Sequence, residues 1–387
     1  MTNSTTDAIA ILERLVGFKT ISALTNLDII QYIEDYLKSH GIESNLSYDE
    51  TGERSNIHAI IGPAIDGGVV LNGHTDVVPV EGQEWTADPF TLIERDNRLY
   101  GRGAVDMKGF LACMLAAVPV WKQKPLTRPI HISMCYDEEI GGFGAPVLVR
   151  DMGKTVPHPA IAIVGEPTMM NIITGHKGGY EMHTEITGLE AHSSDPRKGA
   201  SAIRYAADLI SHIYGIADRL KNAPDNQSPY DPSYTTINIG TIHGGSGANI
   251  VAGHCSFEWE FRPMPDDDGD KILAEINEYA FNELLPRMRQ HYPQADIDIT
   301  TLAKVPGLDH KNADQAAQLI SEITGINSTG VVSFGTDAGH FCNADISTVV
   351  FGPGSIDQAH KPDEYIEISQ LDACMSFFNK LGDHLSK

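Results

Sequence analysis

The sequence predicts an α/β protein that carries a smaller α+β domain as an insertion. Its 387 residues exceed the size at which one hydrophobic core usually stops growing, so two domains are expected. Hydrophobic residues make up 41% of the chain and charged residues 21%, as in ordinary globular proteins. Helical and strand-like apolar segments alternate at both ends of the chain, whereas the middle is richer in strands that alternate apolar and polar residues.

The outer parts of the chain predict βα units. Apolar spacing favours helices at 7–15, 26–40, 110–121, 312–324 and 371–384, and apolar runs favour strands at 69–71, 130–136, 160–164 and 348–351. The runs are mostly apolar, which is typical of strands covered on both faces. We therefore assign residues 1–177 and 305–387 to one domain.

The middle of the chain, residues 178–304, predicts a ferredoxin-like module of order β-α-β-β-α-β. Its strands are expected at 180–187, 235–242, 255–262 and 295–302, its helices at 200–214 and 271–288, and a loop at 224–232. An insertion is the economical arrangement, because either outer part alone would be an incomplete sheet.

Charge and composition exclude several classes of protein. The formal net charge is −24, and no basic stripe that could bind nucleic acid is found. No apolar run approaches a membrane span, and the N-terminal segment lacks the pattern of a secretory signal, so we expect no membrane partner and a cytoplasmic location. Five scattered cysteines without CxxC spacing suggest small buried side chains and neither disulfides nor a thiolate metal site. A protein acting on small molecules or peptides fits these features.

Acids and imidazoles follow the predicted strands where they end. His74 and Asp76 follow the strand at 69–71, and Glu138 and Glu139 follow the strand at 130–136. Glu166 and His360 follow the strands at 160–164 and 348–351, and Asp106 lies in a glycine-rich turn before a helix. Ligands of open α/β sheets bind beyond the carboxyl ends of strands, so we expect these side chains on one rim.

The residue types on this rim indicate a metal site. Two histidines and three carboxylates form a mixed nitrogen and oxygen set suited to zinc, cobalt or manganese, with enough oxygens for two ions. Three negative ligands and one bridging hydroxide would neutralise two divalent ions. Asp106 is the preferred bridge, because one carboxylate can give an oxygen to each metal.

Glu138 and Glu139 are expected to divide two roles. In an extended chain neighbouring side chains face opposite sides, so one would bind metal and the other would accept a proton from metal-bound water. Their spacing does not say which. His74 and Asp76, two apart, would face the same side, so Asp76 would orient the His74 ring.

The segments HTDVVP, YGRGAVDMKG, YDEEIGG, GEPT and AHKPDEYI together resemble the M20 family of co-catalytic zinc amidohydrolases and peptidases over nearly the whole chain. The resemblance implies a zinc-exopeptidase-like domain with a mixed central sheet and an inserted lid that also forms the interface of a homodimer. It implies two metals, zinc or alternatively cobalt. His74, Asp106 and Glu166 would bind one metal, and Asp106, Glu139 and His360 would bind the other.

The resemblance also implies roles for the remaining candidates. Glu138 would be the general base and Asp76 would orient His74, while His192 in GLEAHSSDP would reach the partner subunit's site and stabilise an oxyanion. Asn249 and Arg262 would hold the substrate carboxylate. Residues near the substrate loops are Gly335, Gly352 and Gly354, for which turns with positive φ are an equal alternative.

Within the family, LNGHTDVVPVEGQEWTADPF, GLEAHSSDPRKGASAI and GPGSIDQAHKPDEYIE are most similar to the acetylornithine deacetylase branch. This implies a small N-acyl amino acid as substrate, with hydrolysis of N2-acetyl-L-ornithine in arginine biosynthesis. A desuccinylase acting on succinyl-diaminopimelate, an aminoacylase, a carboxypeptidase or a dipeptidase remain alternatives, as does a binding protein that lost the chemistry. The segment 333–345 matches that branch least well.

Overall fold

The computed structural model describes residues 4–223 and 228–387, so part of the loop predicted at 224–232 lies outside the described residues. The chain forms two compact units. The first contains residues up to 176 together with 308–332 and 336–387, and the second contains residues 177–307 and 333–335. The boundaries thus fall at 177 and 307, close to the predicted 178 and 304, and a short return segment belongs to the second unit.

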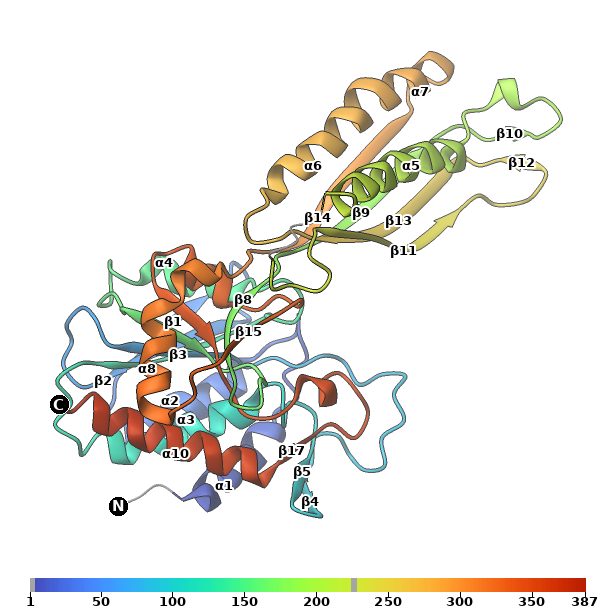
Figure 1. Cartoon of the computed structure of the whole chain (residues 1–387). Helices are drawn as coiled ribbons and strands as arrows, with labels where there is room; N and C mark the ends of the chain where they lie inside the picture. The colour runs from blue at the N-terminus through green and yellow to red at the C-terminus, as the bar shows by residue number, and fades with distance from the viewer. Residues whose placement is uncertain (1–3, 224–227) are drawn as a thin grey trace. The chain divides into compact units, whose positions relative to one another are not determined.

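The first unit is built on a mixed eight-stranded sheet with the order β1-β2-β6-β3-β7-β16-β8-β15 (Figure 1). The strands are β1 Ser44–Tyr48, β2 Ser55–Ile61, β3 Val69–His74, β6 Ile130–Cys135, β7 Ile161–Val164, β8 Ile172–His176, β15 Thr329–Val332 and β16 Ser347–Val350. β3 runs parallel to β6 and β7, and β16 runs parallel to β7. The central strands therefore end at a common edge, and this edge carries most of the candidate ligands.

Helices cover both faces of this sheet. One face packs against α1 Thr5–Val16, α2 Leu27–Ser39, α3 Lys108–Trp121, α8 Asp314–Thr324 and α10 Ile368–His384. The other face packs against α4 Gly144–Asp151 and α9 Ala338–Cys342. Strand β3 serves both cores, because Leu71 contributes to the first and Val70 to the second. Apolar residues on both sides of a strand are what a covered sheet requires, as predicted.

A small sheet with the order β17-β5-β4 adjoins the ligand loops of the first unit. Its strands are β4 Ile93–Arg95, β5 Arg98–Tyr100 and β17 Tyr365–Glu367. Strand β17 directly follows the loop of His360, so its pairing with β5 holds one end of that loop.

The second unit has an antiparallel sheet with the order β11-β13-β9-β14 and helices on one face (Figure 1). Its elements are β9 Gly179–Thr187, β10 Ala191–His192, α5 Ala202–Lys221, β11 Thr236–Gly244, β12 Ile250–Val251, β13 His254–Arg262, α6 Gly269–Glu278, a π-helical turn Tyr279–Leu284, α7 Leu285–His291 and β14 Asp296–Val305. In β9, Met182 and Ile186 are buried under the helices while Glu181 and Glu185 are exposed. The alternation and the β-α-β-β-α-β order of the main elements match the sequence prediction.

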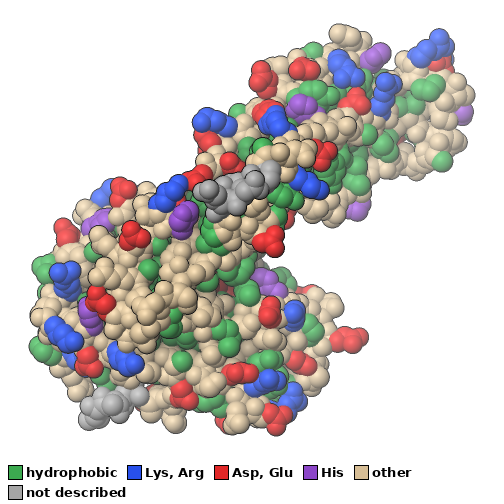
Figure 2. All heavy atoms as spheres, in the orientation of Figure 1, with side chains coloured by type: hydrophobic (Ala, Val, Ile, Leu, Met, Phe, Trp, Pro, Cys, Tyr) green, Lys and Arg blue, Asp and Glu red, His purple; other side chains and the backbone are tan. Residues whose placement is uncertain are grey.

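The described residues also show the surface charge, the hydropathy of the helices and the state of the cysteines. Acidic and basic side chains are interspersed over the face shown in Figure 2, without a continuous basic area there. No helix among residues 4–223 and 228–387 is both long and apolar enough to cross a membrane. All five cysteines are free and buried, as expected.

Candidate metal centre

His74 ends strand β3 with a buried imidazole that faces two carboxylates. Its Nε2 lies 3.1 Å from Oδ1 of Asp106 and 3.6 Å from Oε1 of Glu166. Its Nδ1 lies 3.0 Å from the backbone carbonyl of Asp76. A proton on Nδ1 can be donated to that carbonyl, which leaves the Nε2 lone pair free for a metal.

Asp106 lies between two imidazoles. Oδ1 faces His74, and Oδ2 lies 3.2 Å from Nε2 of His360. The same His360 nitrogen lies 2.9 Å from Oε2 of Glu139. The two oxygens of Asp106 therefore point to separate groups, with His74 and Glu166 on one side and His360 and Glu139 on the other.

Glu138 and Glu139 stand in a turn, so the premise of an extended segment is wrong. Asp137 has φ 53°, and the carbonyl of Glu138 accepts hydrogen bonds from the backbone N–H groups of Gly141 and Gly142. Potential ligand atoms of His74, Asp106 and Glu139 lie within 4.8 Å of one another, and so do those of His74, Glu138 and Glu166. The turn brings both glutamates to the cluster, and geometry alone allows Glu138 to bind metal as well.

The carboxylate of Asp76 hydrogen-bonds to the turn of Glu138 and Glu139 at shorter distances than its distance to the ring of His74. That carboxylate lies 3.5 Å from Nδ1 of His74, farther than the carbonyl of Asp76 itself. The carboxylate accepts hydrogen bonds from the backbone N–H groups of Glu138 at 3.2 Å and Glu139 at 3.3 Å, and from the hydroxyl of Ser22 at 2.7 Å. Asp76 thus links the strand of His74 to the turn that carries both glutamates, a role that sequence spacing does not reveal.

The cluster has the chemistry of a cation site. The buried Oε1 atoms of Glu139 and Glu166 have no hydrogen-bond partner in the described residues. Burial and the charge of Glu166 hold the pKa of Glu138 well above its ordinary value, and burial and Asp106 raise that of Glu139 to about 7. Buried carboxylates in this number need positive charge nearby, and divalent metals on imidazole and carboxylate ligands would supply it.

The second unit places two candidates together. His192 and Asn249 lie on a short ribbon in which β10 pairs with β12, and the N–H of Ser193 donates to the carbonyl of Asn249 at 3.0 Å. The N–H of Ser194 donates to Nδ1 of His192 at 3.2 Å. This bond favours the tautomer in which Nε2 carries the proton and can donate to a ligand.

Arg262 lies at the opposite end of the same sheet. Strand β13 runs from His254, near the ribbon, to Arg262, a span of roughly 25–30 Å at about 3.4 Å per residue. The ribbon continues outward from the His254 end (Figure 1). The guanidinium of Arg262 pairs with both carboxylate oxygens of Glu260, at 3.2 and 2.9 Å. One copy of this unit therefore does not bring His192 and Arg262 together.

The candidate glycines differ in what fixes them. Gly354 has φ 86°, and a Cβ there would lie 2.3 Å from a methyl carbon of Val105, so backbone geometry requires glycine. At Gly352 a Cβ would lie 2.0 Å from the carbonyl oxygen of Gly165. A Cβ at Gly335 would make only ordinary contacts, the nearest at 3.4 Å. The positive-φ alternative thus accounts for Gly354, close backbone packing accounts for Gly352, and Gly335 stays a candidate.

Residues 70–384 match the model of Peptidase family M20/M25/M40. The chain belongs to this family. The acetylornithine deacetylase of Photorhabdus laumondii is 35% identical over 388 residues, covering 97% of this chain and 96% of that protein. The enzyme of the same name from Shigella sonnei is 34% identical over 374 residues, with 95% and 94% covered.

Solved structures share the M20 fold at low identity. A tripeptidase from Staphylococcus aureus has a TM-score of 0.72 at 21% identity, with both chains fully covered. An M20 metallo-carboxypeptidase from Sulfolobus solfataricus has a TM-score of 0.74 at 18% identity, with 98% of this chain and 99% of that chain covered. These structures confirm the predicted mixed α/β fold. The family match and the relatives at about one third identity show that the chain is a metallohydrolase that acts on amides.

Sequence reasoning missed a buried acid beneath the M20 ligands. Asp337 is 1% exposed, and its Oδ2 accepts a hydrogen bond from the thiol of Cys135 at 2.8 Å. Its Oδ1 and Nε2 of His340 have no hydrogen-bond partner in the described residues, and both lie near Gly142 of the glutamate turn. The motif SFGTDAGHF contains these residues, but no predicted strand precedes it, so no sequence pattern places them at this edge of the sheet.

We expect the metal-free M20 chain to lose stability as the pH rises from 6.5 to 9. His360 has its pKa raised to about 10 by Asp106 and Glu139, and the pKa values of His74, Glu138 and Glu166 are also raised well above normal. The folded chain therefore binds more protons than the unfolded chain in this window, so its unfolding free energy falls as the protons leave. Thermal unfolding after chelation should show the melting temperature dropping by roughly 5–10 °C.

The metal-loaded protein is the control for this pH dependence, because bound metal replaces the protons on the same ligands. His58 and His131 are buried with pKa values lowered to about 4 and about 3, so both are neutral in the folded chain above pH 6.5. In the unfolded chain they are still partly protonated near pH 6.5, and this small opposing contribution is the same for loaded and stripped protein. Parallel melting curves for loaded and stripped protein across this range would contradict the assignment of these residues as ligands.

Proposed function

We propose that the chain hydrolyses N2-acetyl-L-ornithine to L-ornithine and acetate, and that it does so in the cytoplasm as a step of arginine biosynthesis. The observation that carries the proposal is the identity of about one third with acetylornithine deacetylases over almost the full length of both chains. The cluster of imidazoles and carboxylates in the first unit supports amide hydrolysis as the chemistry. The solved structures named above support the fold and not the substrate.

Two divalent metals, zinc or cobalt, fit the cluster. His74, Asp106 and Glu166 would hold one, and Asp106, Glu139 and His360 the other; this division follows the pairs of contacts that each oxygen of Asp106 makes. When bound, the metals would polarise the acyl carbonyl and lower the pKa of a water molecule. A neighbouring base is then needed to take the proton of that water.

Glu138 is our candidate for that base. It is half-buried beside His74 and Glu166, and its backbone is held by Asp76, which fixes the direction of the side chain. Burial favours the protonated acid, whereas nearby dications would favour the carboxylate. This balance suits a group that takes a proton from water and returns it to the leaving amine.

We further propose that the enzyme works as a homodimer through the second unit, which also acts as its lid. Asn249 and Arg262 are our candidates for the substrate carboxylate, Gly335 for the loop beside it, and His192 for the oxyanion. A substrate no more than about 10 Å long cannot touch His192 and Arg262 of the same copy, because they lie at opposite ends of β13. Asn249 lies beside His192 on the ribbon, so the proposal takes both His192 and Asn249 from the partner subunit, while Arg262 comes from the same chain as the metal centre.

The edge strand β11 supports the second unit as the interface. All of its residues from Gly240 to Gly244 are exposed, including the apolar Ile242 at 52%. Exposed apolar edge strands readily pair with another chain. Joining two such edges would cover Ile242 and leave each ribbon with His192 free to reach across.

A substrate panel tests the proposed activity. We expect kcat/KM for N2-acetyl-L-ornithine to exceed that for succinyl-diaminopimelate, other N-acetyl amino acids and dipeptides by a factor of at least about 10². The assay is run with zinc and with cobalt. A dipeptide or another acyl amino acid as the best substrate would assign a different M20 activity. No turnover of any compound with metal bound would favour a binding protein.

A further inference from the structure

A polar network lies behind the segments of Asp106 and His360, and the proposed reaction gives it no role. Oε1 of Glu364 accepts hydrogen bonds from the backbone N–H groups of Val105 at 2.9 Å and Asp106 at 3.2 Å. Oε2 of Glu364 accepts a bond from Nη1 of Arg102 at 2.7 Å. Both Arg102 and Glu364 are 1% exposed, so these bonds form in the protein interior.

Gln83 extends this network to the backbone of His360. Its Nε2 donates to the carbonyl of His360 at 3.0 Å. Its Oε1 accepts bonds from Nη2 of Arg102 at 2.5 Å and from Nε1 of Trp85 at 3.1 Å. Gln83 thus connects the carbonyl of His360 to Arg102. Arg102 in turn pairs with Glu364, which binds the backbone of Asp106.

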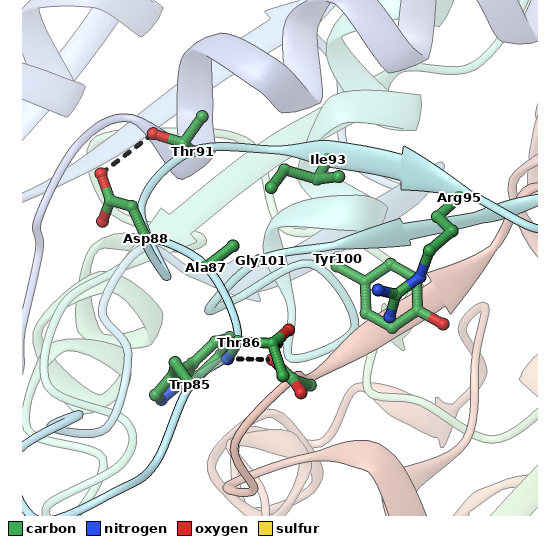
Figure 3. Close-up of a pocket in the computed structure, with 10 residues that line it drawn as sticks. Trp85, Thr86, Ala87, Asp88, Thr91, Ile93, Arg95, Tyr100 and Gly101 are labelled. Atoms are coloured by element: carbon green, nitrogen blue, oxygen red, sulfur yellow. Dashed lines mark hydrogen bonds between the residues drawn. The ribbon is translucent and has the colours of Figure 1, made fainter.

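The loop that carries Gln83 is itself fixed in place. The guanidinium of Arg102 lies 5.1 Å from the ring centre of Trp85, and the N–H and hydroxyl of Thr86 both donate to Asp363, at 3.0 and 2.9 Å. Figure 3 shows Trp85 and Thr86 along one side of a small surface pocket, with Tyr100 and Arg95 on the other. The loop is therefore held on the outside by Asp363 and on the inside by Arg102.

A gain in folding stability does not by itself explain why the ion pair of Arg102 and Glu364 is buried here. Removing an arginine and a carboxylate from water costs several kcal/mol, and apolar residues of similar size often give an equally stable fold. Hydrogen bonds to the backbone of metal ligands have a separate use, because they fix the direction in which a ligand points. Gln83 bonds to the backbone of His360, and Glu364 bonds to the backbone of Asp106. The side chains of these two candidate ligands face each other, with Nε2 of His360 at 3.2 Å from Oδ2 of Asp106.

We propose that Gln83, Arg102 and Glu364 are positioning residues for metal ligands: Gln83 for His360, a ligand of one metal, and Arg102 with Glu364 for Asp106, the ligand shared by both. The proposal rests on the two-metal function proposed above. Gln83 bonds directly to the backbone of His360 and reaches Asp106 only through Arg102 and Glu364, whereas Glu364 bonds directly to the backbone of the bridging Asp106. Loss of the Gln83 hydrogen bonds should therefore weaken one binding event and spare the metal held by His74 and Glu166.

The test is calorimetric titration of metal-stripped protein with Zn²⁺ alone. Wild type should bind two ions. Gln83→Met keeps the length of the side chain and removes its hydrogen bonds, and it should weaken one event by about 10–100-fold while the other changes less than about two-fold. Gln83 is partly exposed, so the variant should fold, which circular dichroism of the stripped protein checks.

Glu364→Gln is the second variant, and exposed residues supply controls. Glu367, paired with Arg98 at the surface, gives the control Glu367→Gln, and Gln31 on α2 gives the control Gln31→Met. Both controls should bind two ions as wild type does. Glu364→Gln should weaken metal binding, and a drop only in the melting temperature of the stripped protein would make its role structural.

Two outcomes overturn the proposal in distinguishable ways. If wild type binds two ions and Gln83→Met binds both with unchanged or equally weakened affinity, the positioning role is wrong and the two-metal function stands. If wild type itself binds fewer than two ions, both the two-metal function and the positioning role are wrong.

Discussion

Replacing Glu138 with alanine is expected to lower kcat by a factor of about 10³ or more while both metals stay bound. The reason is that Glu138 would move the proton between water and the leaving amine, whereas His74, Asp106, Glu139, Glu166 and His360 would hold the metals. The measurement pairs steady-state kinetics with metal content by mass spectrometry. Glu138→Gln, which keeps the shape of the side chain, should behave in the same way.

Glu139→Ala is the matched control for the Glu138 variants, because the two glutamates share one turn and both lie close to His74. It should lose metal together with activity. If Glu138→Ala loses metal as Glu139→Ala does, Glu138 is a ligand and its assignment as base is wrong. The short distances among Glu138, His74 and Glu166 make this a real alternative.

Mixing two inactive variants is expected to restore activity, which is the second large effect. His192→Ala alone should lower kcat by about 10²–10³ through loss of an oxyanion donor. In a mixed dimer with Glu138→Ala, the first subunit has an intact metal centre and receives His192 from the second. Random exchange of subunits should therefore restore about one quarter of the active sites.

A mixture of Glu138→Ala with Glu139→Ala is the control for this complementation. Both residues belong to one turn of one chain, so no mixed dimer has a complete centre, and activity should stay at the level of the separate variants. The contrary result is that His192→Ala mixed with Glu138→Ala recovers no activity, although mixed dimers are shown to be present. Either His192 and Glu138 of the same chain then act at one site, or His192 takes no part in the reaction.

Much of the fold follows from residue patterns, and the failures have physical causes. Strands β3, β6, β7 and β16 are mostly apolar and mostly buried, and were predicted near their observed ends. Strands β1, β2, β8 and β15 were not predicted; β1 is SNLSY, largely polar at a sheet edge, β2 has a serine, an asparagine and a histidine among its apolar residues, and β15 has four residues including a glycine. Short edge strands depend on pairing with a neighbour, which a local pattern does not contain.

The candidate centre was predictable because its residues follow strands that end at one sheet edge. The turn at Glu138 and Glu139 was not, because it depends on a left-handed Asp137 and on bonds to Asp76 from a distant strand. The separation of His192 from Arg262 also required the structure. Both belong to motifs of the insert, and only the register of β9 and β13 shows that they lie at opposite ends of one sheet.

Anomalous diffraction from crystals of the zinc-loaded protein tests the central claim most directly. We predict two peaks about 3.5–4 Å apart, with one oxygen of Asp106 on each. His74 and Glu166 should bind the first ion, and Glu139 and His360 the second. A single peak, or two ions held by other residues, would contradict the two-metal centre on which the proposed hydrolysis depends.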